Sequence, residues 1–472
     1  MQAAKTSTAS IRIIVNSDAN NSTITLNNVN IDMSGKDDTP AFDMSGATVT
    51  LTLTGSNILK GGKNKAGLYA PIGAILTITG TGTLEAVGGN YGAGIGSGYN
   101  SGYNSGSGEN GGTIAISGGT VTGKGGDYGA GIGGGYKGAG GTITIEGSAE
   151  VKATGGSNGA GIGGGYNGAG SSGGITISGG EVTTTGGAGI GGGYKGAGGT
   201  ITINASSGTA EVKATGGSDG AGIGGGYNGT GAAVTISGGE VTAAGAGGGA
   251  GIGGGSGGTA GTVITFSGNA VIFASSIAPN LTSMSGPQAI AFDGATGTVY
   301  GSVILQQKEL KIPSTHTLTI PASASLEIQT GKTLTNNGIL DNKTGGTLTN
   351  NWTLTNYGDL TNGGTLTNSG TLNNNIGGTL DNSGTLTNNK TLTNSGTLIN
   401  NASGTLTNET DGTLTNSGTL INSNAIIHND GAIANDGGSI IDGTISNTNG
   451  TITNKNSGNI TAVVEGNAIV EE

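Results

Sequence analysis

Five tyrosines occupy the same position in successive copies of a short repeated phrase. Each follows the Ile of a Gly-Ala-Gly-Ile-Gly phrase by four residues, and they are Tyr99, Tyr136, Tyr166, Tyr194 and Tyr227. Exposed aromatic rings in a row can stack on the faces of sugars, whereas rings at this spacing can equally stack on one another and shield an edge of the fold. Polar residues beside the rings could bond sugar hydroxyls, and they are Asn167, Asn228, Lys137 and Lys195. The next copy carries Ser256, so the row ends there under either interpretation.

Residues that could cleave a polysaccharide are scattered along the chain. A lyase needs acidic ligands together with a basic Arg or Lys that abstracts a proton, and a hydrolase needs clustered carboxylates. The one Arg is Arg12, near the start, and Asp37-Asp38 is an isolated acidic pair beside a proline. His316 and His428 stand far apart, and neither lies in a carboxylate-rich motif. We therefore expect no enzyme activity and no catalytic residues.

Composition excludes several kinds of partner. There is no cysteine and no Gly-Gly-x-Gly-x-Asp array, so we expect neither a metal site nor a cofactor. The net charge of -11 argues against nucleic acid and anionic membrane surfaces. No apolar run of about 20 residues occurs, so we expect no membrane insertion. The first residues lack the apolar segment of a signal peptide, and we expect that a leader was trimmed before this numbering begins.

The first half of the chain repeats a unit of three short segments. The repeated Ile recurs at intervals of 28 to 37 residues, from Ile95 to Ile252. Each phrase is followed by an alternating run such as Thr142-Ile143-Thr144-Ile145 and then by a run such as Glu150-Val151-Lys152-Ala153. Such alternation predicts β-strands with Ile and Val turned inward and Thr, Glu and Lys turned outward. Each segment ends at glycines, which predict tight corners.

The second half repeats a shorter unit, Thr-Leu-Thr-Asn-Ser-Gly. Its Leu residues recur every 6 or 8 residues, and Leu340, Leu360 and Leu380 mark a period of 20. That period predicts a compact coil with three sides and one inward Leu on each side. The Asn residues at its corners could stack into ladders of side-chain amides.

Strands this short cannot bury an apolar face alone. If the chain coils, each strand pairs in parallel with its equivalent one coil along, and the stacked coils bury their apolar side chains together. The 106 glycines among 472 residues fit a fold with many corners, and the 32% hydrophobic content argues against disorder. We predict an all-β protein, a right-handed parallel β-helix (β-solenoid) in two segments with different coil size. A left-handed coil remains open for the second segment.

Five regions follow from the change of repeat. We predict an N-terminal cap over 1–20, with Ile11–Val15 as its strand, and a Gly-rich solenoid over 21–264. A transition region over 265–330 holds most of the prolines, and the Thr-Leu-Thr-Asn-Ser-Gly solenoid spans 331–458. A C-terminal cap is predicted over 459–472.

The phrases Ala-Gly-Ile-Gly-Gly-Gly-Tyr and Gly-Thr-Ile-Thr-Ile, and the run from Leu318 to Asn336, resemble known repeats. They are similar to the β-helical repeat regions of bacterial cell-surface proteins of the adhesin-like or carbohydrate-binding-domain type. The resemblance covers most of residues 20 to 455. It implies an extracellular or cell-surface setting and a role in attachment. The wall-sorting motif Leu-Pro-x-Thr-Gly is absent, so the mode of anchoring stays open.

We therefore expect a non-catalytic extracellular surface protein, an adhesin-like stalk or fibre-forming module. Its partners would be glycans, a host or neighbouring cell surface, or further copies joined end to end. One alternative is a carbohydrate-binding module that uses the tyrosine row. Another is an ice-binding protein that uses ranks of Thr-x-Thr, such as Thr353-Leu354-Thr355. Ice-binding proteins confine such Thr to one face, whereas we expect them here on all three, and Thr is in any case a favourable outward residue of strands.

Overall fold

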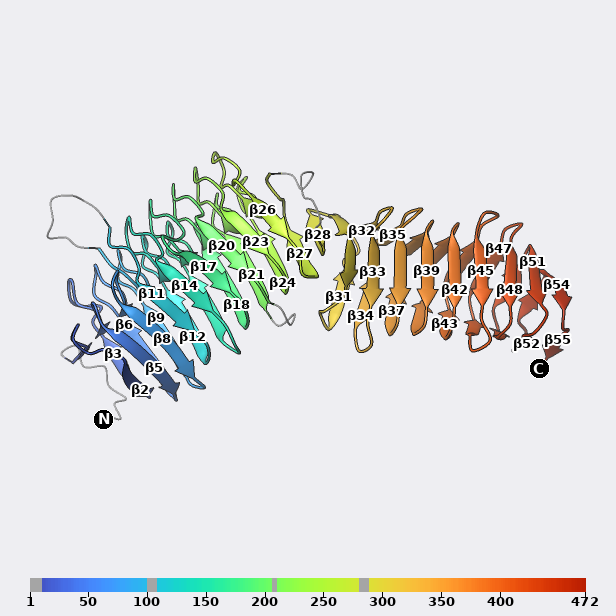
Figure 1. The fold of residues 1–472 in the computed structure, drawn as a ribbon, viewed down its shortest axis with the longest axis horizontal. Helices are drawn as coiled ribbons and strands as arrows, with labels where there is room; N and C mark the ends of the chain where they lie inside the picture. The colour runs from blue at the N-terminus through green and yellow to red at the C-terminus, as the bar shows by residue number, and fades with distance from the viewer. Residues whose placement is uncertain (1–10, 100–107, 206–209, 280–287) are drawn as a thin grey trace. The chain divides into compact units, whose positions relative to one another are not determined.

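The computed structural model describes residues 11–99, 108–205, 210–279 and 288–472. The elements assigned in these ranges are all β-strands (Figure 1). The chain divides into two compact units, Met1–Ser285 and Gly286–Glu472. Each unit is a parallel β-solenoid, in which strands pair with their equivalents one coil along. The predicted parallel β-helix is confirmed. Within the described ranges, no helix has the length and apolar character needed to cross a membrane.

The first solenoid has three parallel sheets of nine strands, here named A, B and C. Sheet A consists of β1 (Ile13–Ile14), β4 (Phe42–Asp43), β7 (Leu68–Tyr69), β10 (Ile95–Gly96), β13 (Ile132–Gly133), β16 (Ile162–Gly163), β19 (Ile190–Gly191), β22 (Ile223–Gly224) and β25 (Ile252–Gly253). Sheet B consists of β2 (Ser22–Asn27), β5 (Thr48–Thr54), β8 (Ile75–Gly80), β11 (Thr113–Ile116), β14 (Thr142–Ile145), β17 (Gly174–Ile177), β20 (Thr200–Ile203), β23 (Ala233–Ile236) and β26 (Ile264–Phe266). Sheet C consists of β3 (Asn30–Asp32), β6 (Ser56–Lys60), β9 (Thr83–Val87), β12 (Thr120–Lys124), β15 (Glu150–Thr154), β18 (Glu181–Gly186), β21 (Glu211–Gly216), β24 (Glu240–Ala244) and β27 (Ala270–Ala274).

The core of this solenoid is a stack of aliphatic side chains in register. The repeated Ile of sheet A pairs with the Ile of the next coil, as Ile132 does with Ile162, and both are fully buried. In sheets B and C the alternation places Ile143 and Val151 inward and their Thr, Glu and Lys neighbours outward, as predicted. Burial of this apolar stack holds the coils together, because no strand has enough apolar surface to be stable alone.

The outer face of sheet C stacks four glutamates directly on one another: Glu150, Glu181, Glu211 and Glu240 pair in register along successive strands. Like charges opposite each other on neighbouring strands are unfavourable. Burial first, and the Glu211 carboxylate second, raise the pKa of Glu240 above its ordinary value of 4.5. With a folded pKa above the unfolded one, Glu240 lowers the stability of the fold as the pH rises through that range.

Replacing Glu240 with Gln should therefore stabilise the first solenoid at pH 7 and flatten the fall in its stability above pH 4.5. The gain should be about 0.5 kcal/mol, since the carboxylate is partly solvated and its repulsion is screened. Urea unfolding at pH 4 and pH 7, followed by circular dichroism, measures it. Glu146→Gln, at an exposed position outside this stack, is the matched control. Equal effects of the two substitutions would show that repulsion within the stack is negligible.

The second solenoid also has three parallel sheets of nine strands, here named D, E and F. It opens with β28 (Ala289–Asp293), which is antiparallel to β29. Sheet D consists of β29 (Thr296–Tyr300), β32 (Thr317–Ile320), β35 (Ile339–Asn342), β38 (Asp359–Asn362), β41 (Thr379–Asn382), β44 (Thr397–Asn400), β47 (Thr419–Asn422), β50 (Ser439–Ile441) and β53 (Asn459–Ile460). Sheet E consists of β30 (Ser302–Ile304), β33 (Ser325–Ile328), β36 (Thr347–Asn350), β39 (Thr365–Asn368), β42 (Thr385–Asn388), β45 (Thr405–Asn408), β48 (Ile426–Asn429), β51 (Thr444–Asn447) and β54 (Val463–Gly466). Sheet F consists of β31 (Glu309–Ile312), β34 (Thr333–Asn336), β37 (Thr353–Asn356), β40 (Thr371–Asn374), β43 (Thr391–Asn394), β46 (Thr413–Asn416), β49 (Ala432–Asp436), β52 (Thr451–Lys455) and β55 (Ile469–Glu471).

Its core has two layers on each side, one of Leu and one of Asn. In a strand such as Thr353–Asn356 the Leu and the Asn point inward and are fully buried. The Asn side chains stack as predicted, but they lie buried at the last position of each strand. Except in the last Asn of each ladder, the Nδ2 donates to the Asn Oδ1 of the next coil at 2.7–2.9 Å, and most also donate to a backbone carbonyl. Three such ladders result: Asn336, Asn356, Asn374, Asn394, Asn416, Asn435 and Asn454 in sheet F; Asn342, Asn362, Asn382, Asn400 and Asn422 in sheet D; and Asn350, Asn368, Asn388, Asn408, Asn429 and Asn447 in sheet E.

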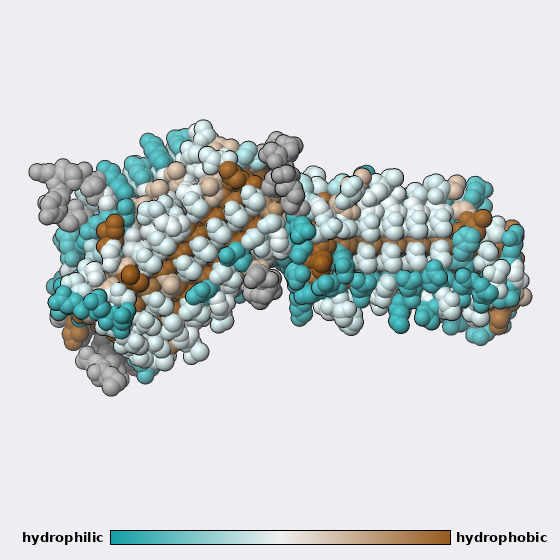
Figure 2. Space-filling model, viewed as in Figure 1, coloured by the Kyte–Doolittle hydropathy of each residue, from teal (hydrophilic) through white to brown (hydrophobic). Residues whose placement is uncertain are grey.

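Outward Thr residues occur on all three sides of the second solenoid, as expected, but their pairing differs between the sheets. Sheet E carries Thr-x-Thr pairs in consecutive coils, for example at Thr365 and Thr385, and in sheet F the run of pairs is interrupted once, by Asn373. On sheet D the equivalent positions are interrupted by Asp341 and Asp381 and then by Ile399. Paired Thr ranks therefore cover two sides of the second solenoid and not all three. Figure 2 shows the sheet faces as rows of pale residues separated by narrow hydrophobic lines.

The ends of the repeat arrays differ from the predicted boundaries. Sheet C continues through β27 at Ala270–Ala274, and sheet E begins with β30 at Ser302–Ile304. Coils therefore occupy much of the predicted transition region, because pairing tolerates departures from the motif as long as inward residues stay apolar. In the predicted caps, β1 forms the edge of sheet A, while residues 1–10 lie outside the described ranges. At the other end β53, β54 and β55 extend sheets D, E and F as one further coil.

Candidate functional site

The backbone of the first solenoid fixes the five predicted tyrosines in one row. The residue after each of the last four tyrosines has a left-handed backbone, as at Lys137 (φ 60°) and Asn167 (φ 57°), which turns the chain sharply. Its N–H then donates to the carbonyl of the Tyr one coil along: Lys137 to Tyr166 at 2.8 Å and Asn167 to Tyr194 at 2.7 Å. This second backbone ladder, outside the sheets, sets the rings at the spacing of the coils.

The rings of the row lie against one another. Tyr136, Tyr166 and Tyr194 are stacked nearly parallel, with centroids 5.5 Å and 5.3 Å apart and interplanar angles of 8° and 5°. Tyr227 continues the stack at 5.1 Å from Tyr194, while Tyr99 meets Tyr136 edge-on at 5.3 Å. All five rings are half-buried, so each contributes to packing and keeps a solvent-facing part. Aromatic pairs in these geometries stabilise a fold by about 0.5–1.5 kcal/mol each.

Sequence reasoning missed a second row beside the first, formed by Tyr91 and Tyr128. These two rings are stacked at 5.2 Å with an angle of 9°. Tyr128 meets Tyr136 and Tyr166 edge-on at 5.5 Å and 5.6 Å. The rows are tied by backbone as well, since the Tyr136 N–H donates to the Tyr91 carbonyl. A sequence signal existed, because both residues precede a repeated Ile by four positions, as the first row follows it by four.

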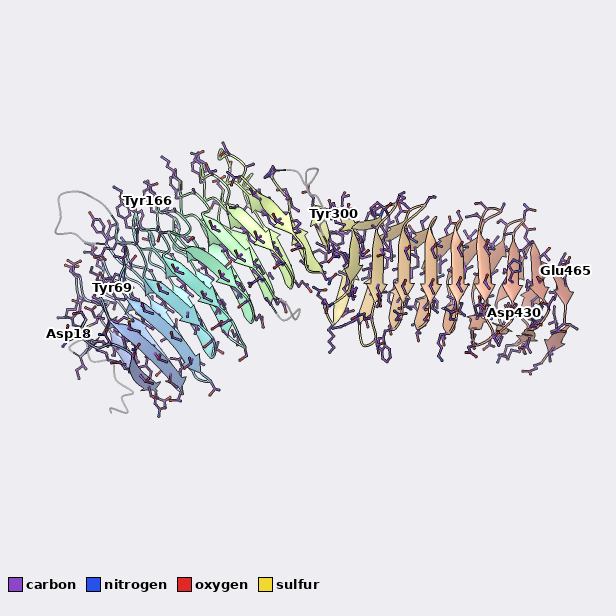
Figure 3. All side chains as sticks on the ribbon, in the orientation of Figure 1. Asp18, Tyr69, Tyr166, Tyr300, Asp430 and Glu465 are labelled. Atoms are coloured by element: carbon purple, nitrogen blue, oxygen red, sulfur yellow. The ribbon has the colours of Figure 1, made fainter. Side chains whose placement is uncertain are left out.

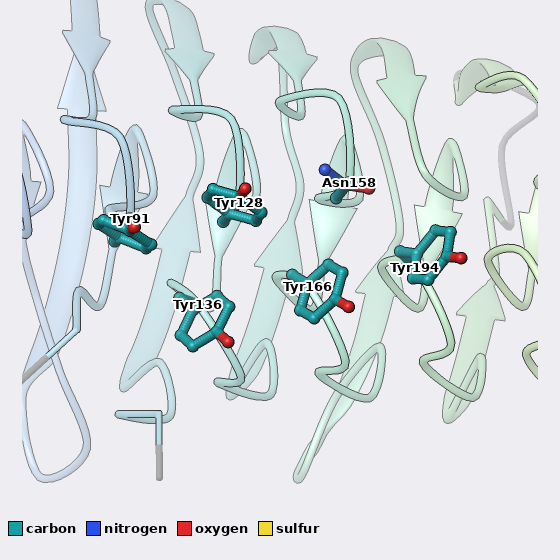
Figure 4. Close-up of a pocket in the computed structure, with 6 residues that line it drawn as sticks. All are labelled: Tyr91, Tyr128, Tyr136, Asn158, Tyr166 and Tyr194. Carbon is teal, nitrogen blue, oxygen red and sulfur yellow. The ribbon is translucent and has the colours of Figure 1, made fainter. Parts of the chain in front are cut away.

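The second row loses its rings after Tyr128, and a hollow opens there. Its equivalent one coil along is Asn158, and Figure 4 shows Tyr91, Tyr128 and Asn158 in one row beside Tyr136, Tyr166 and Tyr194 in the other. These six residues line a hollow of about 470 Å³. A second hollow of about 180 Å³ adjoins it, because both are lined by Asn158 and Tyr194, and it extends to Asp219 and Tyr227. The edge is therefore an aromatic cluster followed by a groove with polar groups.

The polar groups around the rings are suited to hydroxyl-bearing ligands. Lys137 and Lys195 place their Nζ atoms 5.3 Å and 5.5 Å from the centroids of the Tyr136 and Tyr194 rings. Among the described residues, no hydrogen bond involves the hydroxyls of the five predicted tyrosines, which leaves those hydroxyls to solvent or ligand. Nothing in the sequence predicted a cofactor or a metal here, and no group of three His, Cys, Asp or Glu side chains in the described ranges could hold a metal ion.

A buried polar cluster lies in the same solenoid, near the start of these rows, and was not predicted. The Tyr69 hydroxyl donates to Glu109 Oε2 at 2.6 Å, and Lys65 Nζ donates to the Tyr69 hydroxyl at 3.0 Å. Lys65 also forms an ion pair with Glu109 at 3.3 Å. Burial, and then the hydrogen bond to Glu109, raise the pKa of Tyr69 far above its ordinary value, so this phenol stays protonated. Tyr69 and Tyr166 are marked in Figure 3. No sequence signal joins these residues, because Glu109 is 40 residues from Tyr69.

The remaining polar residues weighed for catalysis are dispersed. Arg12 pairs with Asp43 at 3.9 Å, and Asp38 accepts a hydrogen bond from Asn64 at 2.8 Å. Asp37 lines a hollow of about 400 Å³ that also contains Lys36, Lys60 and Lys63. His316 lies beside the ring of Phe292, whereas His428 points outward from sheet E.

The comparison with protein families gave two matches, each to part of the chain. Residues 317–471 match the family described as BigA fourth domain. Residues 76–99, 143–166, 175–194 and 234–256 match the family described as Beta helix repeat. Neither the comparison with curated proteins nor that with solved structures gave a match. The chain is thus similar to β-helical repeat domains, and the two matches together indicate a bacterial surface protein.

Proposed function

We propose that the chain is a non-catalytic, extracellular, adhesin-like module of a bacterial surface protein, and that its tyrosine edge contacts carbohydrate. In this proposal the solenoids are the stiff support, and the two rows of rings with the adjoining groove are the contact surface. The observation that carries it is the hollow lined by Tyr91, Tyr128, Tyr136, Asn158, Tyr166 and Tyr194.

The support role rests on continuity of pairing. Within each solenoid the strands of every sheet pair in parallel from coil to coil. The second solenoid adds three buried amide ladders to that pairing. Parallel ladders of backbone and side-chain hydrogen bonds resist separation of the coils, because opening one coil would leave several buried polar groups without partners.

The contact role rests on the chemistry of the groove. Aromatic faces and edges suit the apolar faces of sugars, and phenol hydroxyls, the Asn158 amide and Lys ammonium groups suit sugar hydroxyls. A non-catalytic role agrees with the buried cluster, in which Lys65, Tyr69 and Glu109 satisfy one another and are largely removed from solvent.

A purely structural edge is the alternative that a specific observation favours. The ring centroids lie 5.1–5.6 Å apart along and between the rows, so much of each aromatic face is already covered by another ring. Under this alternative the tyrosines only stabilise the turns of the stalk, and the module attaches through other surfaces or through further copies.

Binding to a glycan array and to insoluble polysaccharides distinguishes a carbohydrate-contacting edge from a purely structural one. The Tyr136, Tyr166, Tyr194→Ala triple variant should lose at least about tenfold in affinity, since it removes most of the groove wall. The Tyr→Phe triple variant, which keeps the stacks, tests the hydroxyls alone. Tyr357→Ala, at an exposed ring of the second solenoid, is the matched control.

Circular dichroism must show that the triple variant retains its β-structure. Binding lost in the Ala variant and kept in the control supports a carbohydrate-contacting edge. If the wild-type protein binds none of the glycans, or if the Ala variant binds as well as the wild type, the contact role is wrong and the tyrosines are a structural stack.

A further inference from the structure

Sheet B carries a rank of threonines on its outer face, interrupted at one position. One outward position of each strand pairs in register with its equivalent on the next strand. The rank runs Thr23, Thr50, Thr77, Ala115, Thr144, Thr176, Thr202, Thr235 and Thr265, so Ala115 is its one departure from Thr. None of these side chains is buried, so the rank faces solvent in the described ranges.

A parallel second rank lies two residues earlier on the strands. It contains Thr48, Thr113, Thr142 and Thr200, with Ile75, Gly174 and Ala233 at the other positions. Equivalent residues on paired strands are about 4.8 Å apart, and alternate residues along a strand are about 6.7 Å apart. The face therefore carries one nearly complete rank of Thr side chains and a second rank that is Thr at four of its seven positions. Each Thr presents a hydroxyl and a methyl group in a restricted rotamer, because Thr is branched at Cβ.

The scarcity of charge sets this face apart from the sheet beside it. The nine strands of sheet B contain no charged residue, and the exposed Glu146 directly follows β14. In sheet C, every strand except β27 contains at least one. Strand propensity alone explains Thr in both sheets. It does not explain why Glu and Lys are confined to one of them in a chain with a net charge of -11.

We infer that the outer face of sheet B binds ice. Both repeat distances are close to the repeats of water oxygens on ice crystal faces, and strands without charged side chains do not impose the strongly oriented hydration shell that would disrupt such a layer. A crystalline polysaccharide is a poorer match, because it would need aromatic rings to stack on. The only aromatic residue in the nine strands is Phe266, which is buried. This inference is independent of the tyrosine edge and of the function proposed for it.

The test compares the same substitution on two faces of one coil. Thr176→Glu places a charge in the middle of the sheet B rank, between Thr144 and Thr202. Thr183→Glu places it on sheet C between Lys152 and Lys213, where it is compensated. Both variants have the same net charge. The readouts are uptake of labelled protein into slowly growing ice and inhibition of ice recrystallisation.

We expect the wild type and Thr183→Glu to enter ice and to inhibit recrystallisation at the same concentration. Thr176→Glu should need at least about tenfold more protein, because an ion on the face must lose hydration to approach ice. The Tyr136, Tyr166, Tyr194→Ala variant should keep full activity, which separates this surface from the groove. Exclusion of the wild type from ice, or equal activity of the two Glu variants, would overturn the inference.

Discussion

Replacing Asn374 with Ala should destabilise the second solenoid by about 3–5 kcal/mol. Asn374 is fully buried and sits in the middle of the sheet F ladder. Its Oδ1 accepts from Asn356 at 2.8 Å, and its Nδ2 donates to Asn394 Oδ1 at 2.7 Å and to the Thr397 carbonyl at 2.8 Å. Truncation leaves a cavity and takes a partner from each of these groups, which are too buried for water to replace it.

Trp352 provides a local measurement of this effect. It is the one Trp of the chain, and its carbonyl accepts from Thr371 N–H, on the strand that contains Asn374. It is 48% exposed, so its fluorescence should respond when the coil opens. Urea unfolding followed at this residue should show a lower midpoint for Asn374→Ala. Asn373→Ala is the control, because Asn373 points outward from the same strand and pairs with Thr355 and Thr393.

Asn374→Asp separates hydrogen bonding from cavity formation. The carboxyl fills the same space but, once ionised, cannot donate to Asn394 Oδ1 or to the Thr397 carbonyl. Burial and these facing acceptors would raise its pKa, so the variant should lose stability as the pH rises from about 4 to 7. If Asn374→Ala unfolds at the same urea concentration as Asn373→Ala, the ladder adds nothing to the stability of the coils.

The strands of both solenoids could be predicted because period-two alternation leaves little choice of face. In Thr142–Ile145 a shift by one residue would expose Ile143 and Ile145, so the pattern alone determines which side chains are buried. Likewise, the 20-residue period that joins Leu340 to Leu360 predicts one coil, and these two residues pair in register. In both cases the pattern within one short segment determines which side chains face inward, and the same pattern recurs in every coil that pairs with it.

Contacts between turns could not be predicted in the same way. The Tyr91 and Tyr128 rings reach the predicted row because the turns before and after sheet A lie side by side, which depends on the path of the backbone. Glu109 meets Tyr69 across 40 residues, and no periodicity joins them. For the Asn ladder, the sequence predicted stacking but not burial, because an Asn at the end of a strand is equally typical of an exposed corner. Burial there becomes favourable only when the amides of several coils are satisfied together.

Close approach of the turns in the first solenoid can be tested at Gly165, which directly precedes Tyr166. A methyl group there would lie 2.0 Å from the Gly135 carbonyl oxygen and 2.8 Å from the Tyr128 carbonyl oxygen. Both are backbone atoms of the preceding coil, so the clash cannot be relieved by a side-chain rotation. Gly165→Ala should therefore destabilise the first solenoid by about 3 kcal/mol, because adjacent coils must separate to admit the methyl group.

The same substitution should disturb the tyrosine rows. Moving the turn that holds Tyr166 away from its neighbours would break its stack on Tyr136, 5.5 Å away, and weaken the near-ultraviolet circular dichroism of the tyrosines. Gly35→Ala is the control, since a methyl group there meets no atom within 4 Å. It should leave the spectrum unchanged and alter stability by less than about 1 kcal/mol. A Gly165→Ala variant that unfolds like Gly35→Ala would mean that the coils can separate locally at little cost, and the edge could not then hold its rings in a fixed geometry.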